Sequence, residues 1–211
     1  YCQHLFLSYL YQEPGSERLL FKGGTALRIV FESSRFSEDL DFSGVNIRSA
    51  EIEKIITNTL SNIEKSGLAI DIVESKKTSG GYLAILIFKI EEYISKIQIE
   101  ISLRGGKQIM GTRAIIRNDF IPAYTLVHLP TEDLIGQKIE ALLDRKKPRD
   151  FFDYYYLLSG NYAIAKNKHN LQTILVLLEK SKIDFRNELR RFLPASQARH
   201  MKDFRKILID K

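Results

Sequence analysis

The stretch spanning residues 19–43 constrains this chain more than any other part of it. An apolar run at residues 19–21 comes directly before two glycines, Gly23 and Gly24. An amphipathic segment follows the glycines, so the order predicts a strand, a tight turn and the start of a helix. The first N–H groups of a helix have no partner within the helix and carry partial positive charge. The sequence therefore predicts a seat for a phosphate group at the two glycines.

The same stretch ends in alternating acidic and apolar residues, Asp39-Leu40-Asp41-Phe42. Successive side chains of a strand point to opposite faces, so we expect both carboxylates on one face and the apolar pair in the core. Two neighbouring carboxylates repel each other, and a hard divalent cation such as Mg²⁺ relieves that repulsion while using their oxygens as ligands. A phosphate seat beside a two-carboxylate metal site is an arrangement typical of nucleotidyl transfer.

The hydrophobic pattern changes near Pro130. Residues 1–130 mix strand-like alternation with helical segments, whereas helical spacing dominates residues 131–211. We therefore expect an α+β fold, with a mixed β-sheet domain and flanking helices over residues 1–130. A helical module over residues 131–211 is expected to complete the active-site cleft. A chain of 211 residues that is 44% hydrophobic can bury a sizeable core in such an arrangement.

Cysteine usage and the lengths of the apolar runs exclude other classes of protein. Cys2 is the only cysteine, so no disulfide framework exists and a reducing, cytoplasmic location is expected. The longest apolar run, at residues 82–88, is too short to cross a bilayer, and we expect no membrane partner. No signal peptide is visible, and because the chain begins at Tyr1 without methionine, we expect upstream residues to be missing. The four histidines lack partners at metal-ligand spacing.

Basic residues are concentrated at the end of the chain. Residues 182–211 contain nine Lys or Arg and four Asp or Glu, a net charge of +5 against +6 for the whole chain. One interpretation is a polyanionic partner such as RNA, and the other is a solvated helix surface. The sequence leaves both open. The candidate nucleic-acid contacts are Arg186, Arg190, Arg191, Arg199, Lys202 and Arg205.

A lysine that faces inward distinguishes the helical part. Lys138 is four residues from both Leu134 and Leu142, so it lies on or beside the buried stripe of its predicted helix. A buried ammonium group is costly without an anionic partner, although a long stem can also carry the charge out to water. The next predicted helix carries Asp150 and Asp153 on one face. An antiparallel pairing of the two helices would bring one of these acids to Lys138.

Four motifs in this order resemble the AbiEii/AbiGii family of nucleotidyltransferase toxins. The first two are KGGTAL at residues 22–27 and RFSEDLDF at residues 35–42. Residues 138–145 are similar to the family's KxxAxxxR motif, and residues 149–157 to RDxxDLxxL, with Tyr154 in place of the usual leucine. The resemblance implies a nucleotidyltransferase-like fold and the toxin half of a bacterial toxin–antitoxin or phage-defence pair.

The resemblance also implies the chemistry, which is transfer of a nucleoside monophosphate from an NTP with Mg²⁺ or Mn²⁺ as cofactor. The metal ligands would be Asp39, Asp41 and Glu100, although Glu100 can equally be a base for the attacking hydroxyl or an ordinary solvent-facing glutamate. The catalytic residues would be Asp39, Asp41, Lys138, Asp150 and Asp153, with either of the last two orienting Lys138 or binding nucleotide. Nucleotide binding would fall to Lys22, Gly23, Gly24, Thr25, Ser37, Lys138 and Arg145, and Thr25 is also a candidate helix cap.

The expected partners are the NTP, an RNA acceptor and a cognate antitoxin protein. By resemblance, the acceptor site is the 3′ end of tRNA. Two alternatives stay open, namely the same chemistry on a small molecule such as an antibiotic, and a non-catalytic module that binds nucleotide or antitoxin. The intact acidic and lysine motifs favour an enzyme, because a retired site has no physical need for a buried lysine facing acids.

Overall fold

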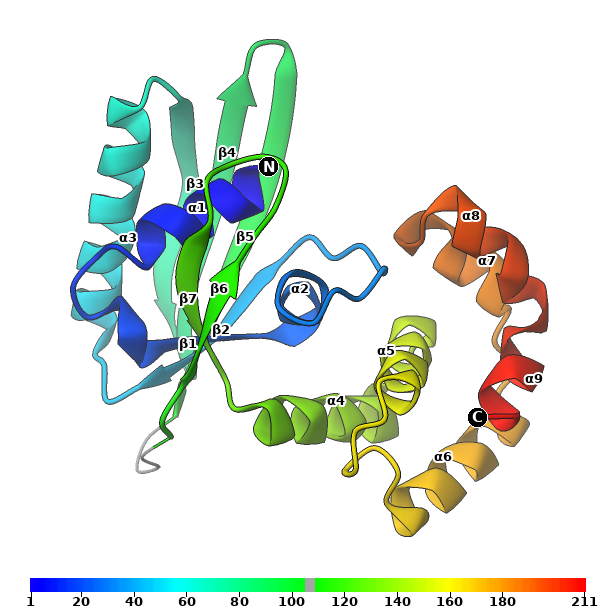
Figure 1. The fold of residues 1–211 in the computed structure, drawn as a ribbon. Coiled ribbons are helices and arrows are strands. Elements are labelled where there is room, and N and C mark those ends of the chain that lie inside the picture. The colour runs from blue at the N-terminus through cyan, green and yellow to red at the C-terminus, as the bar shows by residue number, and fades with distance from the viewer. Residues whose placement is uncertain (105–108) are drawn as a thin grey trace. The chain divides into compact units, whose positions relative to one another are not determined.

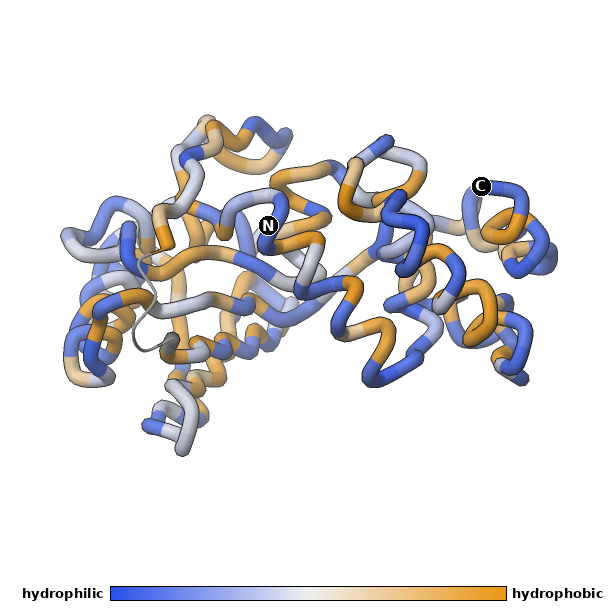
Figure 2. Tube along the Cα trace, turned by 90° about the horizontal axis from the view of Figure 1, so that it is seen from below, coloured by the Kyte–Doolittle hydropathy of each residue, from blue (hydrophilic) through white to orange (hydrophobic). Residues whose placement is uncertain are grey.

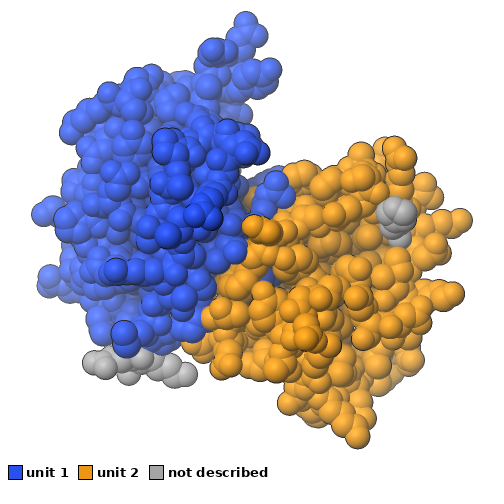
Figure 3. Space-filling model, viewed as in Figure 1, with its two compact units in different colours: residues 1–30, 38–130 blue, residues 31–37, 131–211 orange. Residues whose placement is uncertain are grey.

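The computed structural model describes residues 1–104 and 109–211, which form two compact units (Figure 3). The first unit contains Tyr1–Val30 and Glu38–Pro130, and the second contains Phe31–Ser37 and Thr131–Lys211. The sequence division at Pro130 did not anticipate that residues 31–37 join the helical unit while both of their flanks belong to the sheet unit. The chain therefore passes from one unit to the other three times.

A seven-stranded mixed sheet forms the centre of the first unit (Figure 1). The strands are β1 (Leu19–Lys22), β2 (Leu40–Val45), β3 (Ala69–Thr78), β4 (Gly81–Ile90), β5 (Tyr93–Arg104), β6 (Thr112–Ile116) and β7 (Tyr124–His128). Their order across the sheet is β3-β4-β5-β2-β1-β7-β6. β2 runs antiparallel to β1 and parallel to β5, so the strand that carries the DLD motif lies at the centre of the sheet.

Helices α1 (Cys2–Leu10) and α3 (Ser49–Lys65) contact each other and cover one face of the sheet (Figure 1). Leu40 and Phe42 are fully buried in the core, as the alternation of the DLD motif predicts. A 3₁₀ turn, η1 (Ser16–Arg18), leads into β1, and the short helix α2 (Gly23–Ile29) begins directly after β1 ends. The predicted order of strand, glycine turn and helix is therefore confirmed.

The second unit is helical. It contains α4 (Thr131–Arg145), α5 (Pro148–Ser159), α6 (Lys168–Lys180), α7 (Phe185–Leu189), η2 (Arg190–Phe192), α8 (Ala195–Ala198), η3 (Arg199–Asp203) and α9 (Phe204–Ile209). Its core is aromatic: Phe151 packs edge-on against Phe185, and Phe152 stacks on Phe204. Along these helices hydrophobic and hydrophilic stretches alternate (Figure 2), as expected of amphipathic helices that bury one side. The α+β fold class is confirmed.

Tyr154, where the resembled motif has leucine, is buried, and its hydroxyl donates to the carbonyl of Ala165 at 2.8 Å. The tyrosine therefore keeps the apolar packing of the position and also ties α5 to the loop before α6. Among the described residues, no helix combines the length and the apolar character that crossing a membrane requires.

Candidate active site

Strand register places Lys22, Asp41 and Glu100 next to one another on one face of the sheet. Lys22 is the cross-strand partner of Asp41, and Asp41 is the partner of Glu100. Directly opposite residues on neighbouring strands project to the same face with Cβ atoms about 5 Å apart. The parallel pairing of β2 with β5 is what brings Glu100 beside Asp41. We call these three residues the charged row; its formal charge is −1.

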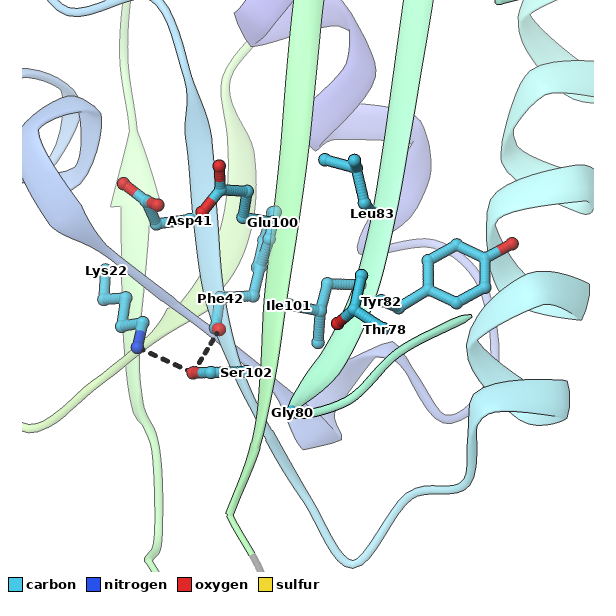
Figure 4. Close-up of a pocket in the computed structure, with 10 residues that line it drawn as sticks. All are labelled: Lys22, Asp41, Phe42, Thr78, Gly80, Tyr82, Leu83, Glu100, Ile101 and Ser102. Carbon is cyan, nitrogen blue, oxygen red and sulfur yellow. Dashed lines mark hydrogen bonds between the residues drawn. The ribbon is translucent and has the colours of Figure 1, made fainter. Parts of the chain in front are cut away.

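A pocket of about 340 Å³ opens along the charged row (Figure 4). The Lys22 ammonium donates to Ser102 Oγ at 2.8 Å, and that hydroxyl donates to the Phe42 carbonyl at 3.2 Å. In Figure 4 the carboxylates of Asp41 and Glu100 lie together, while the Lys22 side chain reaches toward Ser102. The lining residues are Lys22, Asp41, Phe42, Thr78, Gly80, Tyr82, Leu83, Glu100, Ile101 and Ser102.

Gly23 is required at its position for two reasons. Its φ of +82° lies in the left-handed region that side chains rarely adopt. A Cβ atom there would also overlap the carboxylate of Asp41. The glycine turn therefore lies directly against the Asp41 side chain, which places the predicted phosphate seat beside an acidic residue of the charged row.

Thr25 and Asp39 take positions that differ from the expectation. Thr25 does not cap α2: the N-cap is Lys22, and the buried Thr25 hydroxyl donates to the backbone carbonyl of Asp39. That bond holds Asp39 just ahead of β2, which begins at Leu40, and the Asp39 side chain is exposed. Asp39 therefore lies one residue ahead of the strand, and the acid paired with Asp41 on the neighbouring strand is Glu100.

The oxygen atoms of the charged row have the chemistry that Mg²⁺ prefers. Asp41 and Glu100 supply hard carboxylate oxygens on one face and line one pocket. Within residues 1–104 and 109–211, however, no three His, Cys, Asp or Glu side chains converge into a metal-binding group. The two acids supply part of the ligand set that a divalent cation needs.

In the second unit Arg35, Lys138 and Asp153 form a buried triad of charges. Arg35 binds the carboxylate with two hydrogen bonds, Nε to Oδ1 at 2.6 Å and Nη2 to Oδ2 at 3.0 Å. The Lys138 ammonium donates to the same Oδ2 at 2.8 Å. The side chains are 4%, 11% and 1% exposed, respectively. The predicted contact between Lys138 and a helix-borne acid is confirmed, and the acid is Asp153.

The two cations determine the protonation state of Asp153. Burial alone would raise the pKa of this carboxyl, but the charges and hydrogen bonds of Lys138 and Arg35 hold the pKa below its ordinary value. Because Arg35 already neutralises the carboxylate, the charge of Lys138 is left over and the triad carries +1. Both carboxylate oxygens of Asp153 are taken by Arg35 and Lys138.

Asp150 has a different neighbourhood. Its buried carboxylate accepts the backbone N–H of Lys147 at 3.3 Å at the start of α5, and it pairs with Arg145 at 2.7 Å. This acid therefore caps its own helix and fixes the α4–α5 turn. The Arg145 side chain is 41% exposed even though it forms this ion pair.

Arg35 and Ser102 are the functional candidates that the sequence did not single out. Ser102 carries no sequence signal beyond its place on the polar face of β5, two residues after Glu100. Arg35 stands in the RFSEDLDF motif, and the need to neutralise an inward-facing acid would have pointed to it. Ser37 is half-buried at the end of the same segment that carries Arg35.

Comparison with known proteins gives one family and several related folds. A family model described as "Nucleotidyl transferase AbiEii toxin, Type IV TA system" matches residues 5–210. The crystal structure of JHP933 from Helicobacter pylori is similar over 99% of this chain and 89% of its own, with 18% identity and a TM-score of 0.61. MenT4, the nucleotidyltransferase toxin Rv2826c from Mycobacterium tuberculosis H37Rv, is similar over 100% and 82%, with 16% identity and a TM-score of 0.57. A search of curated proteins finds no match.

Proposed function

The chain belongs to the AbiEii family of nucleotidyltransferase toxins of type IV toxin–antitoxin systems, and we propose that it transfers a nucleoside monophosphate from an NTP to an RNA acceptor. The observation that carries this proposal is the charged row, in which Asp41 and Glu100 stand side by side next to the glycine turn. Carboxylates from neighbouring strands beside a phosphate seat are suited to binding a metal–nucleotide complex.

In the sheet unit, Asp41, Glu100 and Asp39, which lies one residue ahead of β2, would hold Mg²⁺ or Mn²⁺, which when bound neutralises phosphate oxygens and activates a hydroxyl. Gly23 leaves the space that the Asp41 carboxylate occupies. Lys22 contributes an ammonium group to the same pocket. The backbone of Gly24 and Thr25 forms the start of α2 and seats phosphate oxygens, and Thr25 fixes Asp39 through its hydroxyl.

In the helical unit, Lys138 supplies the positive charge that stabilises the triphosphate as negative charge builds in the transition state. Asp153 orients the ammonium through the 2.8 Å hydrogen bond. Asp150 acts indirectly, by holding Arg145 in place for the nucleotide. Ser37 adds a hydroxyl on the segment that carries Arg35.

RNA is proposed as acceptor because of the basic C-terminal segment, and the 3′ end of tRNA is the acceptor site that the family resemblance implies. Its net charge of +5 would attract a phosphodiester chain. Arg205 is removed from the predicted contacts, since its guanidinium donates to the carbonyls of Leu178 and Ser181 and so closes the end of α6. The other five cations of that set are exposed: Arg186, Arg190, Arg191, Arg199 and Lys202.

The test is to incubate the protein with total RNA and each labelled NTP in turn, in the presence of Mg²⁺ or Mn²⁺. We expect label in the RNA fraction with the wild type and none with Asp41→Asn. RNA oxidised with periodate lacks the terminal diol and should accept no label if the 3′ end is the acceptor. Label that appears only in small molecules would support the small-acceptor alternative, and no transfer of any kind would support a binding module.

A further inference from the structure

Two adjoining pockets on the second unit are lined by several of the cations proposed above to contact RNA. The arginine pocket, of about 440 Å³, is lined by Arg186, Asn187, Arg190, Leu193, Ala195, Ala198 and Arg199. The aromatic pocket, of about 560 Å³, is lined by Lys147, Pro148, Arg149, Asn187, Glu188, Arg191 and Phe192. Asn187 on α7 lines both pockets, so the two are neighbours along that helix.

The arginine pocket concentrates positive charge. Three guanidinium groups from α7, η2 and η3 surround it, and no carboxylate lines it. Within the part of the chain that the structure describes, none of these three arginines forms an ion pair. Guanidinium groups have the fork of donors that matches phosphate oxygens, and their mutual repulsion is relieved when an anion binds among them.

The aromatic pocket adds a flat surface to this charge. The Arg191 guanidinium lies over the Phe192 ring, 4.6 Å from its centroid. Lys147 and Arg149 also line this pocket, and Glu188 is the one acidic residue among its lining residues. Arg149, the first residue of the RD motif, lies outside the buried triad and lines this pocket. Aromatic rings that stack bases, with cations that follow the backbone, are the features of single-strand nucleic-acid sites.

The wall of the aromatic pocket is tied to the segment that carries Arg35. The backbone N–H of Phe36 donates to the carbonyl of Phe192 at 2.7 Å. The neighbouring Ser34 hydroxyl donates to Gln197 at 2.5 Å. The residues on both sides of Arg35 are thus fastened to the short helices that line the pockets, which gives them a fixed support within the second unit.

We propose that the arginine and aromatic pockets together bind the single-stranded part of the RNA acceptor. A base stacks against Phe192 and Arg191 in the aromatic pocket, and the adjoining phosphates pair with Arg186, Arg190 and Arg199. The proposal rests on the proposed function, because it takes RNA as the acceptor. Its test measures RNA binding alone, without NTP or metal, so that it can fail or succeed independently of nucleotide transfer.

The first experiment titrates the full chain into a fluorescent single-stranded RNA oligonucleotide at several salt concentrations and follows anisotropy. Each phosphate contact contributes roughly 0.7 to the slope of log affinity against log salt. The triple variant R186Q/R190Q/R199Q should therefore lower the slope by about 2 and the affinity about 100-fold near 0.1 M salt. An unchanged slope overturns the proposal and leaves an acidic antitoxin segment as the better occupant.

A matched control and a second variant distinguish an effect of the protein's net charge from binding at these two pockets. K54Q/K65Q/R117Q removes three exposed cations from the sheet unit and should change RNA affinity far less. Equal losses in the two triple variants would mean that only net charge matters, against the proposal. Phe192→Leu should lower affinity between about five- and a hundredfold with the salt slope unchanged, because stacking is lost and no charge is.

Discussion

The charged row of the sheet unit and the buried triad of the helical unit contain the same kinds of group in opposite proportion. The row has two carboxylates and one ammonium, Lys22, for a charge of −1. The triad has two cations and one carboxylate, Asp153, for a charge of +1. A net negative charge suits a divalent cation and a net positive charge suits a triphosphate. In each cluster the single residue of opposite charge, Lys22 in the row and Asp153 in the triad, cancels one of the two like charges and leaves one charge for a ligand.

The two clusters are also held in different ways. Backbone pairing of β1, β2 and β5 fixes the row, whose members range from half-buried to exposed. Side-chain hydrogen bonds fix the triad, which joins Arg35 to a carboxylate 118 residues away in the sequence. A change of charge in the row should therefore alter chemistry and leave the fold intact. A change of charge in the triad should alter both, by an amount that depends on the charge that remains.

The largest effect is expected from Asp41→Asn, with Asp39→Asn as the companion variant. Each should lower nucleotide transfer by at least about 100-fold and weaken metal-dependent nucleotide binding, because charge at the metal site is lost. The melting temperature of Asp41→Asn should stay the same or rise, since a carboxylate opposite Glu100 is removed. Radiolabel transfer and thermal melting in a metal chelator check this. Normal transfer by the double variant would refute the assignment of the row.

Lys138→Met should come next. The methionine keeps the bulk of the stem, and the remaining Arg35–Asp153 pair is neutral and bound by two hydrogen bonds. We expect the free energy of unfolding to change by no more than about 1 kcal/mol. The rate of the chemical step should fall about 100-fold, measured as single-turnover transfer at saturating NTP. A large loss of stability with little loss of rate would show that Lys138 is structural.

Arg35→Met tests the idea that Arg35 keeps the charge of Lys138 available. Without Arg35, Asp153 neutralises Lys138 and the triad carries no net charge. Transfer should slow about tenfold, which corresponds to about 1.4 kcal/mol in the barrier. The double variant R35M/D153N restores a charge of +1 and should recover much of that rate, even though an amide oxygen is a weaker acceptor for the Lys138 ammonium than a carboxylate oxygen.

Recovery of the transfer rate in R35M/D153N would show that Arg35 acts through its charge and not by holding its segment in place. If Arg35 only held the segment in place, R35M/D153N would be slower than R35M, because the Lys138 ammonium would then lose its carboxylate acceptor as well. Arg35→Lys keeps the charge but not the two-pronged contact, and should lie between the wild type and Arg35→Met in rate. Transfer rates for all four proteins, measured with thermal melting as a control for folding, decide between the two explanations.

Local pattern predicted much of this arrangement, and long-range contacts account for what it missed. The DLD alternation placed Leu40 and Phe42 in the core, and strict alternation placed Glu100 on the polar face that meets Asp41. Arg35 was missed because its partner lies far along the chain. No periodicity within residues 31–37 reveals that this segment packs with the helical unit. Asp39 lies one residue ahead of β2, where its carbonyl accepts a hydrogen bond from Thr25, and no local pattern in the sequence reveals that contact.

The smallest expected effect is a difference in acid stability. The pKa of Asp153 is lowered in the folded protein, so its carboxylate binds fewer protons when folded than when unfolded. Its stabilising contribution is therefore fully present above the ordinary pKa of about 4 and is lost as the pH falls through the lowered value.

Urea denaturation between pH 3 and 7 measures this contribution. Below about pH 4 the free energy of unfolding should fall more steeply for the wild type than for Asp153→Asn, by at most about 1.4 kcal/mol per pH unit. Above pH 5 the free energies of unfolding of the two proteins should vary with pH in the same way. The carboxyl of Asp153 is then ionised in both the folded and the unfolded wild type, and the variant has no carboxyl at this position. Parallel curves down to pH 3 would mean that the triad does not hold the carboxylate in its charged form.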